Sequence, residues 1–204
     1  MQVEISNVLL DGFNLKNHEF LVKKDYYDLA SGKQEYRLYS YLTTFFDNCT
    51  ILDIGTFDGR SAVALSHNET NNVISYDIED KINSPGHRIY SKSNIVFKIK
   101  NVLDDLTEEL VSQCKIVLID IDHYETIESQ IIARLKELNF SGIILLDDTT
   151  NHPEPHINIC MNRLWNSIKE TKYDFTKYGH FSGTGLVVMN SNIAFKFEDD
   201  LVSY

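Results

Sequence analysis

The sequence has 204 residues, 43% of them hydrophobic, and this length and composition fit one compact domain with a sizeable core. Thirty acidic residues against nineteen basic ones give a net charge of -11, and no block of lysine or arginine interrupts the acidic balance. Nucleic acid and anionic membranes are therefore not expected as partners, because binding to phosphate groups depends on clustered positive charge.

Cysteine usage and the start of the chain bear on the compartment. Cys49, Cys114 and Cys160 are far apart and show no Cys-x-x-Cys spacing, which predicts a reduced compartment and no zinc site. The first residues include an early acid, Glu4, and no signal-like apolar core follows. No apolar run approaches the roughly 18 to 20 residues of a membrane helix. We expect a soluble, cytoplasmic protein.

Five short runs rich in valine and isoleucine recur along the chain, at residues 50–54, 73–77, 95–99, 115–119 and 142–146. Such runs are typical of strands in a parallel sheet that helices cover on both faces. Apolar stripes at helical spacing predict helices over residues 33–46, 125–138 and 157–169. The alternation predicts the α/β class with a doubly wound, Rossmann-like sheet.

The end of the chain departs from this alternation. Residues 173–178 and 185–189 resemble two strands, and the loop between them is too short for the crossover that a parallel pair needs. We therefore expect five parallel strands closed by an antiparallel C-terminal hairpin. We predict a single domain over residues 1–204, with the core at 33–190. In the N-terminal cap segment, 1–32, Tyr26 and Tyr27 either line a substrate pocket or pack as part of the cap.

The first predicted strand runs into a helix through the loop of ILDIGTFDGRSA, residues 51–62. Gly55 and Gly59 predict a sharp turn and a close approach of a ligand to the backbone. The spacing is not Gly-x-Gly-x-x-Gly, and the acids Asp53 and Asp58 would repel a pyrophosphate, which disfavours NAD. The same acids suit a ligand that carries an ammonium or a sulfonium group.

The next two strands end in side chains that favour a nucleoside. Asp77 ends the second strand, 24 residues after Asp53 (77 − 53 = 24), and an acid at this place usually binds ribose hydroxyls. A helix cap is the alternative role for Asp77. Asn101, after the third strand, can face an adenine edge.

Two pairs of acids follow the fourth and fifth predicted strands, Asp120 with Asp122 and Asp147 with Asp148. One strand–helix–strand unit separates the pairs, so both lie at the carboxyl edge where open α/β sheets bind ligands. Four converging carboxylates repel one another unless they are protonated or bind a cation. An oxygen-only set favours Mg²⁺ or a similar hard divalent metal.

The motifs ILDIGTFDGRSA, YDIE, KNVLD, VLIDIDHYE and GIILLDD stand in an order that resembles the class I S-adenosylmethionine-dependent methyltransferases, over about residues 33–190. The acid pattern is similar to that of the macrocin and cephamycin type of O-methyltransferase, with a partial likeness to the catechol type. The resemblance implies a seven-stranded fold. It also implies methyl transfer from S-adenosyl-L-methionine to a hydroxyl of a small molecule, with a sugar or glycoside preferred and a phenol second.

The resemblance also assigns roles to residues. It implies that the cofactor is bound by Asp53, Gly55, Thr56, Phe57, Gly59, Ser61, Asp77, Ile78, Asn101, Val102 and Asp120. A divalent metal, Mg²⁺ or a similar ion, would be held by Asp120, Asp147 and Asp148. Asp122 would be the general base, with His123 as the alternative. His152 and His180 lie on loops that either overhang the site or are solvated.

Several alternatives stay open. The acids can serve the cofactor alone in a metal-independent methyltransferase of a phenolic or other small acceptor. A nucleotide-binding oxidoreductase is disfavoured by the glycine spacing and by Asp58. A non-catalytic domain that keeps the cofactor pocket is a further alternative, and a homodimer can complete an open acceptor site.

Overall fold

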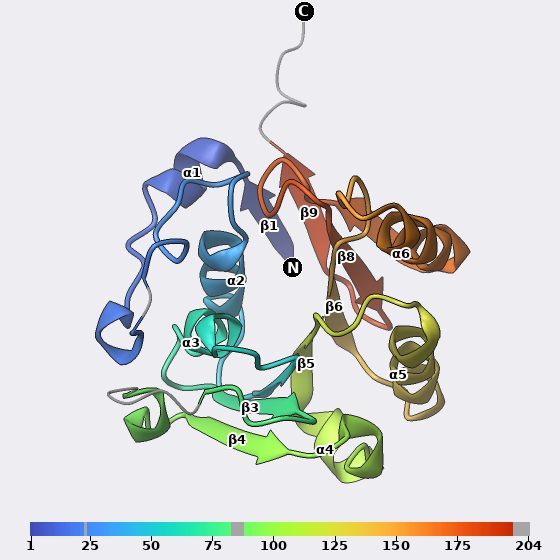
Figure 1. Ribbon diagram of the computed structural model, residues 1–204, viewed down its shortest axis with the longest axis horizontal. Helices are drawn as coiled ribbons and strands as arrows, with labels where there is room; N and C mark the ends of the chain where they lie inside the picture. The colour runs from blue at the N-terminus through green and yellow to red at the C-terminus, as the bar shows by residue number, and fades with distance from the viewer. Residues whose placement is uncertain (23, 83–87, 198–204) are drawn as a thin grey trace, which may run out of the picture.

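The computed structural model describes residues 1–22, 24–82 and 88–197, so the remaining parts of the predicted domain lie outside the described residues. Its centre is a seven-stranded sheet with the order β4-β3-β2-β5-β6-β8-β7 (Figure 1). The strands are β2 (Thr50–Ile54), β3 (Asn72–Asp77), β4 (Ile95–Ile99), β5 (Cys114–Ile119), β6 (Gly142–Asp147), β7 (Thr171–Asp174) and β8 (Thr184–Met189). Strands β2 to β6 pair in parallel, and β8 runs antiparallel to β6 and to β7. The predicted α/β class, parallel sheet and closing hairpin are confirmed.

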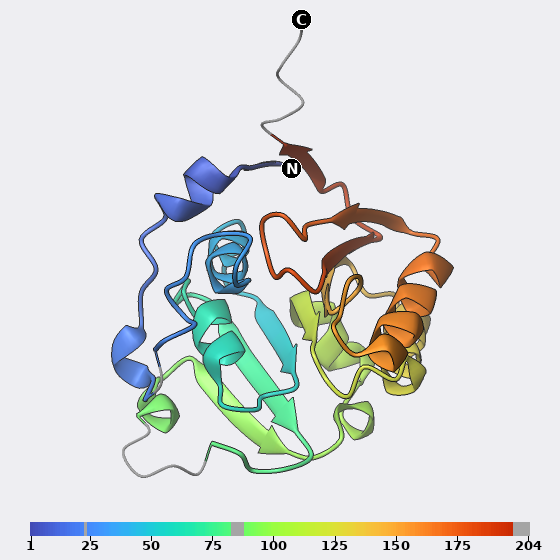
Figure 2. The same ribbon diagram turned by 45° about the horizontal axis from the view of Figure 1, so that its top comes forward.

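Helices cover both faces of this sheet (Figures 1 and 2). Helices α2 (Tyr36–Thr43) and α3 (Arg60–Leu65) belong to one buried apolar cluster, which includes Leu38 and Val63. Helices α4 (Glu108–Gln113), α5 (Thr126–Glu137) and α6 (Pro155–Ser167) belong to the other, which includes Ile131 and Trp165. Since both faces are buried, the strands need apolar residues at every position, which explains the continuous valine and isoleucine runs.

The element boundaries depart most from prediction at one helix and one strand. The helix predicted over 33–46 is shorter, because it begins at Tyr36 and ends at Thr43. The predicted strand over 173–178 is wrong after its second residue, because β7 ends at Asp174 and a turn follows. In that turn the backbone N–H groups of Tyr178 and Gly179 both donate to the carbonyl of Phe175, at 2.8 Å. Period-two patterning does not distinguish such a turn from the end of a strand.

A second, two-stranded sheet was not predicted. Strand β1 (Gln2–Ile5) pairs in parallel with β9 (Ala194–Phe197), which joins the two ends of the described chain (Figure 2). Val3 and Ile5 are buried in the same apolar cluster as α2 and α3. The sequence offers only four residues on each side, which is too short for a periodic signal.

The rest of the N-terminal segment packs beside α2. It contains α1 (Asn7–Asp11) and the 3₁₀ turn η1 (His18–Phe20). Tyr27 is almost fully buried in the same apolar cluster as α2, and its hydroxyl donates to the carbonyl of Lys16 at 3.2 Å. Tyr27 therefore packs as part of the cap, whereas the ring of its neighbour Tyr26 is exposed beside Arg60.

Candidate functional site

The carboxyl ends of the parallel strands surround a cavity of about 550 Å³. Parallel strands end at one edge of a sheet, so loops distant in sequence meet there, and open α/β sheets bind ligands at this edge. The lining residues come from the ends of β2 to β5 and from α5: Ile54, Gly55, Phe57, Tyr76, Asp77, Ile78, Lys81, Lys100, Asn101, Val102, Asp120, Ile121, Asp122, His123, Ile127 and Ile131. The cavity therefore contains most of the residues for which a cofactor role was predicted.

Gly55 sets the shape of the loop that follows β2. Its φ is +106°, and a Cβ atom added there would lie 1.6 Å from the backbone oxygen of Asp120. The glycine thus permits a close approach between the loops after β2 and β5, in addition to exposing backbone to the cavity. Gly59, with φ +82°, begins α3 and packs against Ile89, and it does not line the cavity.

A buried polar network lies beneath this loop. The Ser75 hydroxyl donates to Oδ2 of Asp53 at 2.6 Å and is also 2.6 Å from the hydroxyl of Thr56. Burial raises the pKa of Asp53 to about 6, while hydrogen bonds from Ser75 and Ser61 oppose this change. Asp53, Thr56 and Ser61 are thus placed under the loop, and none of them lines the cavity.

Asp77 is held in one orientation at the end of β3. Its Oδ2 accepts the backbone N–H of Phe57 at 2.9 Å, and its Oδ1 accepts the backbone N–H of Glu79 at 3.0 Å. A carboxylate has about four acceptor sites, so two stay available for hydroxyl groups. The side chains of Phe57 and Ile78 beside it are largely exposed.

The loop after β4 forms the next part of the lining. Asn101 caps the 3₁₀ turn η3 (Val102–Asp104), and its side-chain oxygen accepts the backbone N–H of Leu103 at 3.0 Å. Its side-chain amide nitrogen is therefore the group left to bind a ligand edge. Asp105, which follows this turn, forms ion pairs with Lys98 and Lys100 at 2.8 and 2.5 Å.

Acidic side chains gather next to the cavity, at the ends of β5 and β6. Asp147 and Asp148 are buried, and Asp120 is partly buried. Burial raises the pKa of Asp120, and the charges of Glu35 and Asp148 raise it further. Burial also raises the pKa of Asp147, as do the neighbouring Asp120 and Glu35. The predicted convergence of these acids on one place is present in the structure.

Glu35 is a further buried acid whose charge acts on Asp120 and Asp147, and the sequence did not predict it. It stands at the start of α2, is 6% exposed, and its Oε2 has no hydrogen-bond partner among the described residues. Burial raises its pKa to about 7, and the charge of Asp148 contributes. Its only sequence signal is an acid just before an apolar helix, which is also the pattern of an ordinary helix start.

Three histidines surround these acids. His123 Nε2 lies 3.5 Å from Asp120 Oδ1 and 3.4 Å from Asp148 Oδ2. His152 Nε2 lies 3.5 Å from the same Asp148 oxygen, and His180 Nδ1 lies 4.0 Å from oxygens of Asp147 and Asp148. Burial lowers the pKa of His123 and that of His180. The loops that carry His152 and His180 therefore turn inward to the acids.

The residues fit a bound cation. Ligand atoms of Asp147, Asp148 and His180 all lie within 4.8 Å of one another, and Asp120 does not belong to this group. Asp147 is 8% exposed, and its Oδ1 has no hydrogen-bond partner within the described residues. Because a buried and unpaired carboxylate oxygen is costly, a cation in contact with it would be strongly favoured.

Asp122 takes a different position from Asp120. It lines the cavity with an exposed side chain, and no hydrogen bond or ion pair of its carboxylate is found within residues 1–22, 24–82 and 88–197. His123, its neighbour, has a left-handed backbone with φ 59°. The backbone therefore turns between the two residues, and the imidazole, not the Asp122 carboxylate, reaches the acids of β6.

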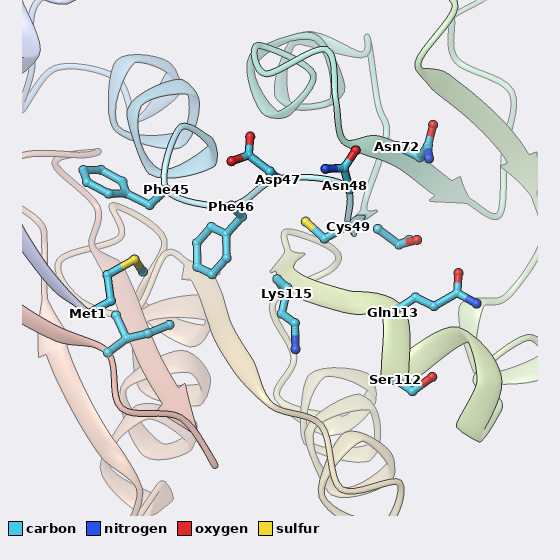
Figure 3. A pocket seen from close by; sticks show the side chains of 12 residues that line it. Met1, Phe45, Phe46, Asp47, Asn48, Cys49, Asn72, Ser112, Gln113 and Lys115 are labelled. Atoms are coloured by element: carbon cyan, nitrogen blue, oxygen red, sulfur yellow. The ribbon is translucent and has the colours of Figure 1, made fainter.

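A second cavity, of about 650 Å³, lies at the opposite edge of the sheet, where β2, β3 and β5 begin (Figure 3). Phe46, Cys49 and Lys115 are among its lining residues. Asp47 is its only lining carboxylate among the described residues, and it accepts hydrogen bonds from Asn68 and Thr70. None of the residues with a predicted role lies there, so the carboxyl edge is the candidate site.

Solved structures share this architecture. The cofactor-bound protein Rv0187 from MTB aligns with a TM-score of 0.54 and 16% identity, over 77% of this chain and 80% of that chain. An O-methyltransferase from Bacillus cereus in complex with SAH aligns with a TM-score of 0.53 and 15% identity, over 76% and 80%. The SAH-bound methyltransferase PaMTH1 from Podospora anserina gives 0.51 and 16%, over 76% and 79%. The chain has the class I methyltransferase fold.

No protein-family model matches the sequence, and a search of the curated proteins finds no match. Among the described residues, no helix is both long and apolar enough to cross a membrane. Within the methyltransferase fold, the cavity lies at the carboxyl ends of β2 to β5, and the acid and histidine cluster adjoins it at β5 and β6.

Proposed function

We propose that this protein is an S-adenosylmethionine-dependent O-methyltransferase that acts on a hydroxyl of a small molecule. One observation carries the proposal: the cavity lined by Gly55, Asp77 and Asn101 continues to Asp120 and His123, so groups suited to bind a nucleoside adjoin groups that can accept a proton. Proteins of the same fold support it, since the Bacillus cereus O-methyltransferase and PaMTH1 were solved with SAH.

Asp77, Asn101 and Phe57 would orient the cofactor. Because two backbone N–H groups fix the Asp77 carboxylate, its remaining lone pairs are preorganised to accept the two ribose hydroxyls. Phe57 and Ile78 are exposed at the cavity and offer apolar contacts to an adenine ring. S-adenosylmethionine, when bound, supplies a methyl group already activated on a sulfonium.

His123 would take the proton of the acceptor hydroxyl. Burial lowers the pKa of its imidazole, so the ring is neutral near pH 7 and has a lone pair to accept a proton. The imidazolium that forms would lie between the carboxylates of Asp120 and Asp148, which stabilise its charge. Asp122, exposed at the same cavity, is the second candidate for this role.

A divalent metal would assist this step, with Asp147 and Asp148 as its nearest ligands. Such an ion, when bound, lowers the pKa of a hydroxyl and fixes its direction. The protein's own part is to keep the ligands buried and converged, which the strand ends of β5 and β6 do. Asp120, beside this group, would hold His123 in place through its Oδ1.

A sugar or glycoside is the preferred acceptor. The loops around the acid cluster present two exposed aromatic rings, Tyr124 and Phe181. Tyr124 stacks on His156, and Phe181 lies against His180, with ring centroids 5.6 and 4.3 Å apart. Rings of this kind provide flat apolar surfaces beside polar groups, a combination that suits a saccharide end.

Two measurements test the proposal. Titration calorimetry with S-adenosylhomocysteine and with NAD should detect binding of the first alone, and binding of NAD alone would overturn the proposal. Transfer of a labelled methyl group to a panel of glycosides and phenols then identifies the acceptor class. The same assay after EDTA treatment tests the metal: turnover should fall and recover on adding divalent ions, whereas unchanged turnover supports the metal-independent alternative.

A further inference from the structure

The loop between β7 and β8 brings a nitrogen ligand to the acid cluster. His180 lies on this loop, and its Nδ1 is 4.0 Å from Oδ1 of Asp147 and 4.0 Å from Oδ1 of Asp148. Two neighbouring ligands of one divalent ion with bonds of about 2.1 Å lie about 3.0 to 3.4 Å apart, so each of these two distances is at most about 1 Å too long. Small side-chain rotations would therefore bring all three groups onto one ion.

The backbone holds this loop against the end of β6. The N–H groups of Thr149 and Thr150 donate to the carbonyls of Gly183 and Ser182, at 3.3 and 3.0 Å. A Cβ atom at Gly183, whose φ is +114°, would lie 2.3 Å from the nitrogen of Thr150. The loop is thus fastened by main-chain contacts, with the His180 ring facing the acids.

The other two histidines have different roles. Nδ1 of His152 accepts the backbone N–H of Glu154 at 3.0 Å, so the proton of its neutral ring is on Nε2. That nitrogen faces Asp148 as a donor and cannot bind a metal in this form. His123 lies between Asp120 and Asp148, outside the compact group of Asp147, Asp148 and His180.

We propose that His180 completes a mixed oxygen and nitrogen metal centre with Asp147 and Asp148, and that this centre takes a first-row transition ion such as Co²⁺ or Mn²⁺ in preference to Mg²⁺. Imidazole suits transition ions, while Mg²⁺ prefers oxygen ligands alone. The buried Asp147 Oδ1, which has no partner among the described residues, marks the position of the ion. This inference deepens the proposed function by naming its metal.

One contact competes with this ligand set. The Ser182 hydroxyl makes a short contact with Nδ1 of His180, the nitrogen that faces the acids. A bound ion would take the place of this contact, and the hydroxyl would rotate away. Removal of the Ser182 hydroxyl should therefore leave the affinity for the metal unchanged or increase it. If the contact between Ser182 and His180 were purely structural, its loss would instead weaken metal binding.

The test is metal binding by untagged protein after EDTA treatment, with no methyl acceptor present. Titration with Co²⁺, followed by visible absorption, and competition with Mg²⁺ give both affinities. We expect Co²⁺ to bind at least about 10-fold more tightly than Mg²⁺. His180→Ala should weaken Co²⁺ binding by about 10- to 100-fold and change Mg²⁺ binding little. Ser182→Ala, and His156→Ala on the exposed surface of α6, should bind Co²⁺ as well as the wild type does.

A second readout does not depend on the folding of a variant. In wild-type protein with ¹⁵N-labelled histidine, electron spin echo spectra of bound Mn²⁺ should show coupling to a histidine nitrogen. Tighter binding of Mg²⁺ than of Co²⁺, no nitrogen coupling, or no binding of any divalent ion would overturn the inference. Binding of S-adenosylhomocysteine by the same protein would still support the methyltransferase proposal, so the two failures are distinguishable.

Discussion

His123 and Asp148 contact each other across the ends of two neighbouring strands, with Nε2 of the histidine 3.4 Å from Oδ2 of the acid. Both have left-handed backbones, with φ of 59° and 55°. A non-glycine residue pays about 1 to 2 kcal/mol for this conformation, and it persists where the surrounding structure holds it. The loops after β5 and β6 thus use backbone strain to bring an imidazole to a buried carboxylate, as expected of a functional site.

The first prediction separates the two candidate bases. His123→Gln should lower turnover by about 100-fold or more, because general bases contribute on the order of 10² to 10⁴. Asp122→Asn should lower it by less than about 10-fold, since its exposed carboxylate does not contact the acids of β6. Rates with saturating acceptor would be measured for both variants from pH 6 to 9. A larger loss in Asp122→Asn than in His123→Gln would assign the base to Asp122.

The second prediction concerns the cofactor. Asp77→Asn should weaken binding of S-adenosylhomocysteine by about 10- to 100-fold, because hydrogen bonds to a charged group contribute about 1.5 to 3 kcal/mol. Glu79→Gln is the matched control, since Glu79 is an exposed acid two residues away whose carboxylate pairs with Lys81. Calorimetry measures both variants. Equal affinities in the two variants would contradict the role of Asp77.

The third prediction tests the close approach at Gly55. Gly55→Ala should destabilise the protein by more than about 3 kcal/mol, because its Cβ would overlap the Asp120 carbonyl and its φ of +106° disfavours alanine. Gly12→Ala is the control, because Gly12 has a φ of -78° and the nearest atom to an added Cβ lies at 3.2 Å. Urea unfolding gives both free energies. A similar small change in both variants would show that the loops can separate at little cost.

The fourth prediction is a pH dependence. Burial raises the pKa of Glu35 from the ordinary 4.5 to about 7, so between these values the folded protein binds more protons than the unfolded chain. Stability must then fall as the pH rises through this window, by about 3 kcal/mol from this group. In EDTA, Glu35→Gln should lose less stability than the wild type between pH 5 and pH 8. Urea unfolding at both pH values measures the free energy of unfolding of each protein. Equal losses in the variant and the wild type would show that the pKa of Glu35 is not raised in the folded protein.

The central sheet and its class could be predicted from the sequence. Strands covered on both faces must be apolar throughout, so β2 and β5 were visible as continuous runs with boundaries correct to within a residue. The convergence of three of the four acids was also predictable, because parallel strands end at one edge and Asp120, Asp147 and Asp148 lie at the ends of two neighbouring strands. These features depend on local pattern and on strand order alone.

Which side chains meet at that edge of the sheet depends on tertiary packing. The charge of Glu35, which stands at the start of a helix 85 residues before Asp120 (120 − 35 = 85), acts on these acids, and His180 approaches them from the hairpin loop. Neither has a periodic or spacing signal, because a contact between distant loops depends on how the backbone turns after each strand. Asp53, at the end of β2, and Thr56, in the loop after it, are likewise buried beneath the cavity, and no sequence pattern predicted this position. Sequence pattern specifies which edge carries the acids, and packing specifies which atoms face one another.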